Sequence, residues 1–300
     1  MTRFLAGIAV ACALAFPAGA ENCANVESGF GVNQKPQNTA REIVGQSLDE
    51  IIERGWIRFA VYEDFPPFVF HKDGKLTGID IDIGKLIARE IGVEAQFYET
   101  AAGENVDADL RNNVWKGSVL GGAVSNVMLH VPYDRELGCR NEQVVLSSPY
   151  FNESIAIAFR KSEYPDGGPV PAYFRFDEVG VENDSLADFY LSSVGNGMLI
   201  PKMKRYSSVA AAMEGLRAGE VKAVMGPRTQ LDFGLDNSID VHEPPLVGLA
   251  KGKWTLGVAV RSSWRPLGYT VEDVIRTAVE NGSMEKIFAE YGVTYKPPDW

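Results

Sequence analysis

Apolar positions along this chain repeat with two periods, and each change of period marks a predicted element. Residues 79–91 place apolar side chains three and four residues apart, which predicts one buried helix face that ends at Gly92. Residues 56–63 and 93–99, on either side, are rich in β-branched and aromatic residues and favour strands. A strand, a helix and a second strand form a βαβ unit, which requires a parallel sheet.

Capping and turn residues predict two smaller elements in the same half. Ser47 as N-cap, Glu50 three residues later and Gly55 as the stop predict a short helix over residues 47–54. The Asp73-Gly74 pair predicts the turn of a short hairpin.

A second βαβ pattern begins near residue 176. It contains a helix that stops at Gly219 and a strand expected over residues 221–225. Between the two units lie long apolar strands over residues 144–151 and 154–161, and another strand, 253–261, follows the second unit. One α/β region is therefore interrupted by another with two crossings, which predicts two lobes, two hinge strands and a cleft.

These patterns predict an α/β protein in which each lobe is a mainly parallel sheet flanked by helices. The expected division is a first lobe of residues 47–154 plus 257–300 and a second lobe of residues 155–256. Residues 21–46 are polar, contain Gly, Asn and Pro, and show no periodicity, so they predict an irregular arm. Helical patterns over residues 271–282 and 284–292 close the chain.

The first twenty residues have the plan of a secretory signal peptide. One arginine precedes an apolar run, and Ala18-Gly19-Ala20 forms a small-residue cleavage site. Export to the periplasm is therefore expected. No later segment is apolar for long enough to span a bilayer, so we expect no membrane insertion.

Charge and cysteine content narrow the function classes. The chain has 29 Lys and Arg against 40 Asp and Glu, a formal net charge of −11, which argues against binding nucleic acid or an anionic membrane. Removal of the signal leaves Cys23 and Cys139. In an oxidising compartment one disulfide is the simplest expectation, and two unpaired thiols are the alternative.

The sequence favours neither a metal site nor an enzyme. The acidic pairs Asp80/Asp82 and Asp107/Asp109 could hold a hard cation, but alternating acids at a helix start are typical of solvated surface charge. Two distant cysteines and three scattered histidines match no zinc spacing. No nucleophile elbow or phosphate-binding loop is present, so we expect no catalytic residues and no cofactor.

Several segments together resemble one family. "FPPFVFHKDGKLTGIDIDIGKLIAREIG", "VVLSSPYF", "VGVENDSLADFYL", "AAMEGLRAGEVKAVMG" and "ENGSMEKIFAEYG" are similar to family 3 of the extracellular solute-binding proteins. These are type II periplasmic binding proteins that deliver polar amino acids to ABC transporters. The resemblance implies a monomer that captures a small polar molecule between two lobes and passes it to an ABC permease.

The resemblance also implies a set of ligand-binding residues. Phe65 falls at the position of an aromatic that lies against the ligand, and Tyr62, just before it, faces either the cleft or solvent. Phe68 and Phe70 are expected in the core. Arg135 falls at the position of an arginine that binds the ligand carboxylate in a bidentate manner, or it is an exposed loop arginine paired with a neighbouring acid.

Departures from the family pattern change the expected ligand. Pro132 stands at a threonine position of the anion-binding segment, and Lys222 and Pro227 replace two acidic residues, the second of which holds the ligand ammonium. The positive charge of Arg228, beside Pro227, disfavours a cationic ligand further, so a small polar or anionic ligand is expected. Ser185 lies near the position of a threonine that grips the carboxylate from the second lobe. His130 is either structural or a ligand contact.

Residues 105–129 suggest an alternative partner. Together with "VPYD" they resemble the periplasmic binding proteins found with quinoprotein dehydrogenases, the MoxJ-like group. This resemblance implies an accessory of a PQQ-dependent methanol or alcohol dehydrogenase, active in methanol oxidation without a transport role. The sequence leaves both the ligand and the choice of partner open.

Overall fold

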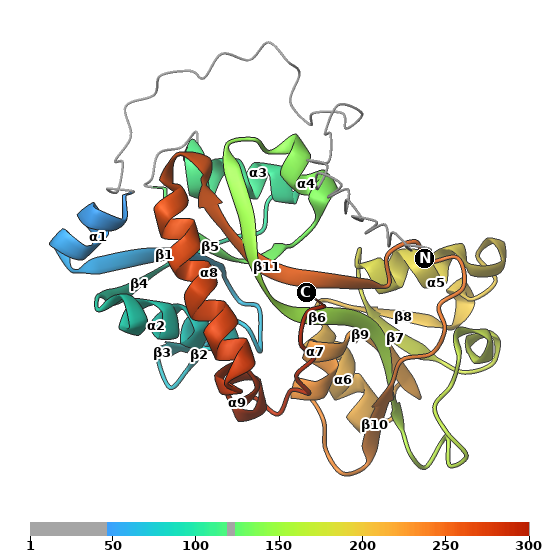
Figure 1. Ribbon diagram of the computed structural model, residues 1–300. Coiled ribbons are helices and arrows are strands. Elements are labelled where there is room, and N and C mark those ends of the chain that lie inside the picture. The colour runs from blue at the N-terminus through green and yellow to red at the C-terminus, as the bar shows by residue number, and fades with distance from the viewer. Residues whose placement is uncertain (1–46, 119–123, 300) are drawn as a thin grey trace, which may run out of the picture.

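The computed structural model describes residues 47–118 and 124–299 of the chain. The predicted signal peptide, the arm 21–46 and Cys23 lie outside the described residues. The fold is mixed α/β, as predicted, and Figure 1 shows two lobes side by side with β6 and β11 passing between them. Within the described ranges, no helix is long and apolar enough to cross a membrane.

The first lobe is built on three parallel strands in the order β4-β1-β5. Ile57, Phe59 and Val61 of β1 alternate into one fully buried cluster, while Ala60 enters the cluster on the opposite face, as the period of a strand requires. A separate hairpin pairs β2 with β3. The strands of this lobe are β1 (Trp56–Tyr62), β2 (Phe70–Lys72), β3 (Lys75–Thr77), β4 (Glu94–Thr100) and β5 (Val127–Pro132).

Helices cover both faces of this sheet. The apolar sides of α2, α8 and α9 pack on one face, and α3, the π-helical turn η1 and α4 pack on the other. The helices of the lobe are α1 (Leu48–Arg54), α2 (Ile79–Ile91), α3 (Val106–Leu110), η1 (Arg111–Trp115), α4 (Arg135–Arg140), α8 (Arg265–Glu280) and α9 (Ser283–Glu290). The 3-10 turn η5 (Ser262–Trp264) precedes α8.

The second lobe repeats this plan with the parallel order β9-β7-β8. Helix α5 packs on one face of its sheet, and α6 and α7 pack on the other. Its strands are β7 (Val179–Glu182), β8 (Met203–Tyr206), β9 (Ala223–Pro227) and β10 (Ile239–His242). Its helices are η2 (Pro171–Arg175), α5 (Leu186–Ser193), η3 (Val194–Asn196), η4 (Ile200–Lys202), α6 (Val209–Ala218) and α7 (Arg228–Phe233).

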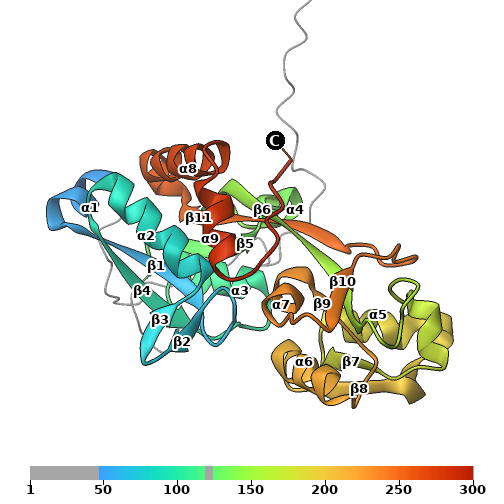
Figure 2. The ribbon, with the colours of Figure 1, turned by 90° about the horizontal axis from the view of Figure 1, so that it is seen from below.

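Two antiparallel strands join the lobes. β6 (Val144–Arg160) pairs with β11 (Lys253–Arg261) in the first lobe and with β9 and β10 in the second. The two separate strands expected over 144–161 are one strand of 17 residues, because its ladder passes from one set of partners to the other without a break in the strand. Figure 2 shows the lobes from below, with α7 turned toward the first lobe.

The register at the hinge brings the carboxyl ends of both parallel sets together. Pro132, at the end of β5, pairs with Leu256 of β11 across the sheet, and Leu256 in turn pairs with Phe151 of β6. Pro227, at the end of β9, pairs with Ile155 of β6. Along β6, only residues 152–154 separate Phe151, where the first lobe's strand ends are paired, from Ile155, where the second lobe's strand end is paired. Ligands of open α/β sheets bind outside the carboxyl ends of the strands, so this register points to the gap between the lobes.

Most local predictions are confirmed. Ser47 and Glu50 form the capping box of α1, and Asp73-Gly74 turns the hairpin with positive φ at both residues. Helix α8 begins at Arg265, earlier than expected, because Pro266 occupies its first turn. Strand β9 begins two residues later than expected, because the N–H of Lys222 donates to the carbonyl of Glu178 in a loop.

The domain boundaries stay predictions, although the buried clusters divide near them. Phe151 and Leu256 belong to the first lobe's cluster, and Ile155 belongs to the second lobe's. Trp254 packs against both clusters, so it lies at the level of the hinge.

Candidate functional site

The end of β1 supplies the aromatic wall of the candidate site. The loop after β1 closes by two hydrogen bonds between the backbones of Phe65 and Val69, 2.8 and 2.9 Å long. This turn stacks Phe65 on Phe68 with ring centroids 5.5 Å apart. Phe68 is 1 % exposed, as expected for a core residue, whereas Phe65 is only half-buried. Phe65 therefore retains a partly accessible face at a strand end.

Tyr62 is held in place by an acid that the sequence assigned to the surface. Its hydroxyl donates to Asp109 Oδ2 at 2.8 Å, and the other oxygen of Asp109 accepts from the Gly103 N–H at 2.8 Å. Burial raises the pKa of Tyr62, and the negative charge of Asp109 raises it further. Burial also raises the pKa of Asp109, which is 4 % exposed. The expectation of a solvated Asp109 is therefore wrong.

His130, on β5, lies among these rings. Its ring centroid is 4.1 Å from Phe68, 5.0 Å from Phe65 and 6.3 Å from Tyr62, each with edge geometry. Its backbone has φ of 59°, which is uncommon outside glycine. Such outliers cluster at functional sites. The structure thus brings Tyr62, Phe65 and His130 of the predicted set together.

Asp80 faces His130 from the first turn of α2 and is fully buried. Its Oδ2 is 3.5 Å from His130 Nδ1, and its Oδ1 accepts from the Tyr150 hydroxyl at 3.3 Å. Burial raises the pKa of Tyr150, and the charge of Asp80 adds to this effect. The expectation of a solvated Asp80 is wrong, because these long-range partners enclose it.

Glu153 lies in the three-residue stretch of β6 between the lobes. It is 2 % exposed and accepts hydrogen bonds from the Thr229 hydroxyl and the Ser154 N–H, the latter at 2.8 Å. Burial raises the pKa of Glu153, and these hydrogen bonds and the nearby His130 partly oppose the rise. A buried carboxylate at the hinge was not predicted from the sequence. Its position inside an apolar strand was the only available signal.

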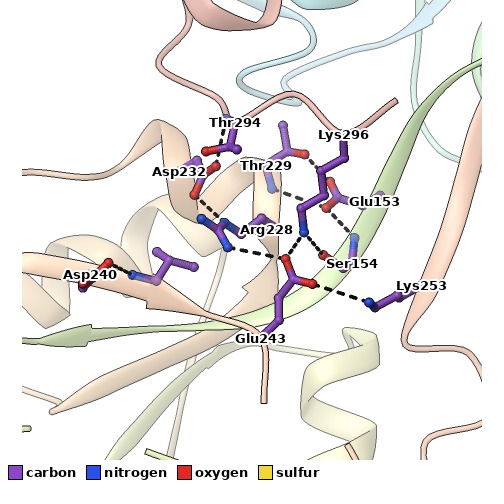
Figure 3. A network of polar contacts seen from close by, with 11 residues as sticks. Glu153, Ser154, Arg228, Thr229, Asp232, Asp240, Glu243, Lys253, Thr294 and Lys296 are labelled. Carbon is purple, nitrogen blue, oxygen red and sulfur yellow. Dashed lines mark hydrogen bonds and ion pairs between the residues drawn. The ribbon is translucent and has the colours of Figure 1, made fainter. Parts of the chain in front are cut away.

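Arg228, predicted to bind an anion, is already paired (Figure 3). Its Nε donates to Asp232 Oδ1 at 2.7 Å, and its Nη1 is 3.4 Å from Glu243 Oε1. Lys296, from the C-terminal segment, also contacts Glu243. Lys253 Nζ lies 3.8 Å from the other oxygen of Glu243, so three cations share two carboxylates in this cluster. The guanidinium of Arg228 is therefore held by protein partners, while the cluster as a whole keeps a positive charge.

Ser185 and Arg135 lie at helix starts beside strand ends. Ser185 caps α5, and its hydroxyl accepts from the Asp188 N–H at 3.2 Å. Arg135 is the first residue of α4 and is exposed. Their contacts to a ligand stay predictions.

Lys222 has a structural partner in the second lobe. Its Nζ is 2.7 Å from Asp177 Oδ1 and 3.6 Å from Glu163 Oε2. These contacts explain a lysine at this position without reference to a ligand.

The described residues contain no group of three or more His, Cys, Asp and Glu side chains that could hold a metal ion. Asp107, one of the acids considered for a cation, instead accepts from Asn141 at 2.5 Å. Cys139 lies in α4. Its predicted partner, Cys23, lies outside the described residues, so the pairing itself stays a prediction.

Three comparisons relate the chain to known proteins. A family model described as bacterial extracellular solute-binding proteins, family 3, matches residues 57–114. The arginine-binding periplasmic protein of Mannheimia haemolytica is 23 % identical over 235 residues, or 76 % of this chain and 87 % of that protein. The L-cystine-binding protein TcyJ of Escherichia coli (strain K12) is 24 % identical over 247 residues, or 80 % and 84 %.

A solved structure supports the fold. An ancestral cationic amino acid solute binding protein has a TM-score of 0.65 at 22 % identity and covers 82 % of this chain and 99 % of its own. The matched segment, the relatives and the fold agree with the predicted resemblance: the chain is similar to the bacterial extracellular solute-binding proteins of family 3 over residues 57–114, and to amino-acid-binding periplasmic proteins over most of its length.

Proposed function

We propose that the chain captures a small polar solute between its lobes in the periplasm and delivers it to an ABC permease. The observation that carries this proposal is the convergence of both sets of parallel strand ends on the hinge, at Pro132 and Pro227. A solute that enters this gap contacts both lobes, so its binding favours their closure. The relatives named above are described as binding proteins, which supports a role without catalysis.

The first lobe supplies most of the proposed contacts. Phe65 and Tyr62 form an aromatic wall, and His130 supplies a polar group beside it. Arg135 is proposed to bind an acidic group of the solute, since a guanidinium matches a carboxylate in a bidentate manner. Ser185 extends the site from the second lobe, and Arg228 closes its edge while paired with Asp232.

The test is a thermal-shift screen of the purified chain against amino acids, amines and dicarboxylates. We expect a saturable rise in melting temperature with at least one compound, because a ligand that binds only the folded state stabilises it. Small-angle X-ray scattering of the same mixture should show a smaller radius of gyration for a monomer. No shift with any compound, at concentrations up to millimolar, would contradict the proposal.

The accessory role with a PQQ-dependent dehydrogenase stays the alternative prediction. It predicts an unchanged melting temperature in the same screen and co-purification with a dehydrogenase. The relatives named above give it no support, because their descriptions concern arginine and L-cystine binding.

A further inference from the structure

We propose a second binding site in the first lobe: a cavity between α8 and the strands β6 and β11 that takes a small monocarboxylate with a compact apolar body. The carboxylate binds Arg261 and Arg265, and the apolar body fills the space beside Gly268. The cavity has a volume of about 160 Å³. It is separate from the proposed solute site, because Val145 in its wall lies roughly 20 Å along β6 from Phe151 at the hinge.

Two arginines at the connection between β11 and α8 form the positive end of the cavity. Arg261 is the last residue of β11, Arg265 is the first residue of α8, and both line the cavity. Within the described ranges neither guanidinium has an ion pair or a hydrogen bond, and the Nε of Arg261 is buried without an acceptor. A guanidinium has only donors, so a buried N–H of this kind favours a ligand that accepts. A planar carboxylate matches the guanidinium fork.

The start of α8 adds positive potential at the same end. Helix α8 has 16 residues, its N-cap Trp264 makes no side-chain capping hydrogen bond, and its first turn contains no acidic residue. The positive end of the helix dipole is therefore not compensated there, which favours an anion.

One carboxylate of the protein also lines the cavity. Glu272 follows Arg265 by seven residues, which is roughly 10 Å along the helix axis. In the part of the chain that the structure describes, Glu272 forms no ion pair with Arg265 or Arg261. It therefore leaves their charge in place and disfavours a second carboxylate at the far end of the cavity, so a monocarboxylate fits better than a dicarboxylate.

Most of the remaining wall is apolar. Val145 and Val260 pair across the β6–β11 ladder, and Tyr269 lines the cavity from α8. The hydroxyl of Ser147, also in the wall, lies 3.2 Å from the hydroxyl of Ser148. An apolar cavity of about 150 Å³ accepts benzene in another protein. The volume here therefore suits a single ring or a short branched chain.

Gly268 is the residue that keeps this volume open. Glycine weakens a helix interior relative to alanine, so its presence in α8 needs a local reason. The usual reasons do not apply, because Gly268 does not have positive φ and a Cβ placed on it would meet no atom of a neighbouring element within 4 Å. Since Gly268 lines the cavity, a side chain at this position would occupy the cavity instead. A residue that breaks a local rule without a backbone or packing cause is typical of a functional site.

The experiment is calorimetric titration of the full chain with benzoate and 3-methylbutanoate. Benzamide has the shape of benzoate without its charge, and inorganic phosphate has a charge without an apolar body, so these two are the comparison probes. R261M removes one guanidinium, and G268L fills the cavity while both guanidiniums remain. R276M removes an exposed arginine of α8 that is paired with Asp273, and it serves as the matched control.

We expect saturable binding of at least one carboxylate, with a Kd of about 1 mM or tighter, and at least tenfold weaker binding of benzamide. R261M should lose at least tenfold in affinity for the carboxylate, G268L should show no binding, and R276M should match the wild type. Leucine favours a helix more than glycine does, so G268L should fold, and thermal melts verify this for each variant.

Several results would overturn the inference. One is a wild type that binds neither carboxylate, and another is a carboxylate that binds R261M or G268L as tightly as the wild type. Benzamide or phosphate that binds as tightly as benzoate would show that the cavity does not select for a charge joined to an apolar body. The proposed function would stand in each case, because R261M and G268L leave the residues of the solute site unchanged.

Discussion

Phe70 of the β2–β3 hairpin and Phe233 at the end of α7 meet across the two lobes, with ring centroids 5.5 Å apart. The hairpin belongs to the first lobe and α7 to the second, so this pair closes a contact away from the hinge strands. The ring of Tyr291, directly after α9, also packs against Phe70, with ring centroids 6.1 Å apart. Phe70, expected in the core of the first lobe, is therefore half-buried at the border between the lobes.

Removing one ring of this pair should loosen the arrangement of the lobes. An aromatic pair contributes about 0.5–1.5 kcal/mol beyond its area, so F233A should weaken solute binding by roughly 2- to 10-fold. Its small-angle scattering should show a larger mean radius of gyration. F189A, which removes a ring that is 60 % exposed on α5, is the control. Equal scattering and affinity for F233A and the wild type would exclude a role in closure.

Glu153 predicts a pH dependence of stability with a definite sign. Burial raises its pKa, so the folded chain holds the proton more strongly than the unfolded chain. Ionisation therefore reduces the free energy of unfolding as the pH rises from about 4 toward neutral. E153Q should gain stability relative to the wild type over the same range, measured by urea denaturation. E214Q, on the exposed surface of α6, controls for the loss of a charge. A difference that stays constant with pH would contradict this assignment.

Lys222 should prove structural. Burial acts to raise the pKa of Asp177, but hydrogen bonds from Lys222 and Tyr164 lower it overall. The stabilisation is therefore present above the unfolded pKa of about 3.9 and is lost as the pH falls through the folded value. Because Lys222 is partly exposed, K222M should lose only about 0.5 kcal/mol at pH 7. Its affinity for solute should be unchanged, as in the surface control K286M. A tenfold loss of affinity in K222M would instead show that Lys222 contributes to solute binding.

Arg135 is the residue proposed to bind the acidic group of the solute. R135A should weaken a carboxylate-bearing probe by more than tenfold, because a bidentate ion pair is lost. Agmatine, which has no carboxylate, should bind R135A and the wild type alike. R265A, at the start of α8 and at the opposite end of β11 from the hinge, is the control. Unchanged affinity for every probe would remove Arg135 from the site.

The predicted disulfide joins Cys139 to a residue outside the described part of the chain. Intact-mass analysis of the exported protein should show the loss of two hydrogens relative to the reduced chain, and peptide mapping should pair Cys139 with Cys23. C139S should lower the melting temperature, since a cross-link restricts the unfolded state. A free Cys23 in the exported wild type would contradict the pairing.

Local signals in the sequence determined the elements, because their causes lie within a few residues. The apolar spacing over residues 79–91, the cap of Ser47 by Glu50 and the Asp73-Gly74 turn each involve groups no more than a few turns apart, and all three are confirmed. The alternation of strand and helix then restricted the sheets to parallel ones, which is why the fold class could be predicted.

Tertiary structure alone decided the chemistry of the site. Asp80 meets Tyr150 across 70 positions, Tyr62 meets Asp109 across 47, and Arg228 pairs with Glu243 across 15. An alternating acid such as Asp80 looks the same in the sequence whether it is solvated or enclosed, because the difference is made by distant side chains that exclude water. The continuity of β6 likewise depends on partners from both lobes. The sequence could therefore place His130 and Phe65 near a cleft, but the polarity of that cleft follows from which charges the fold buries and pairs.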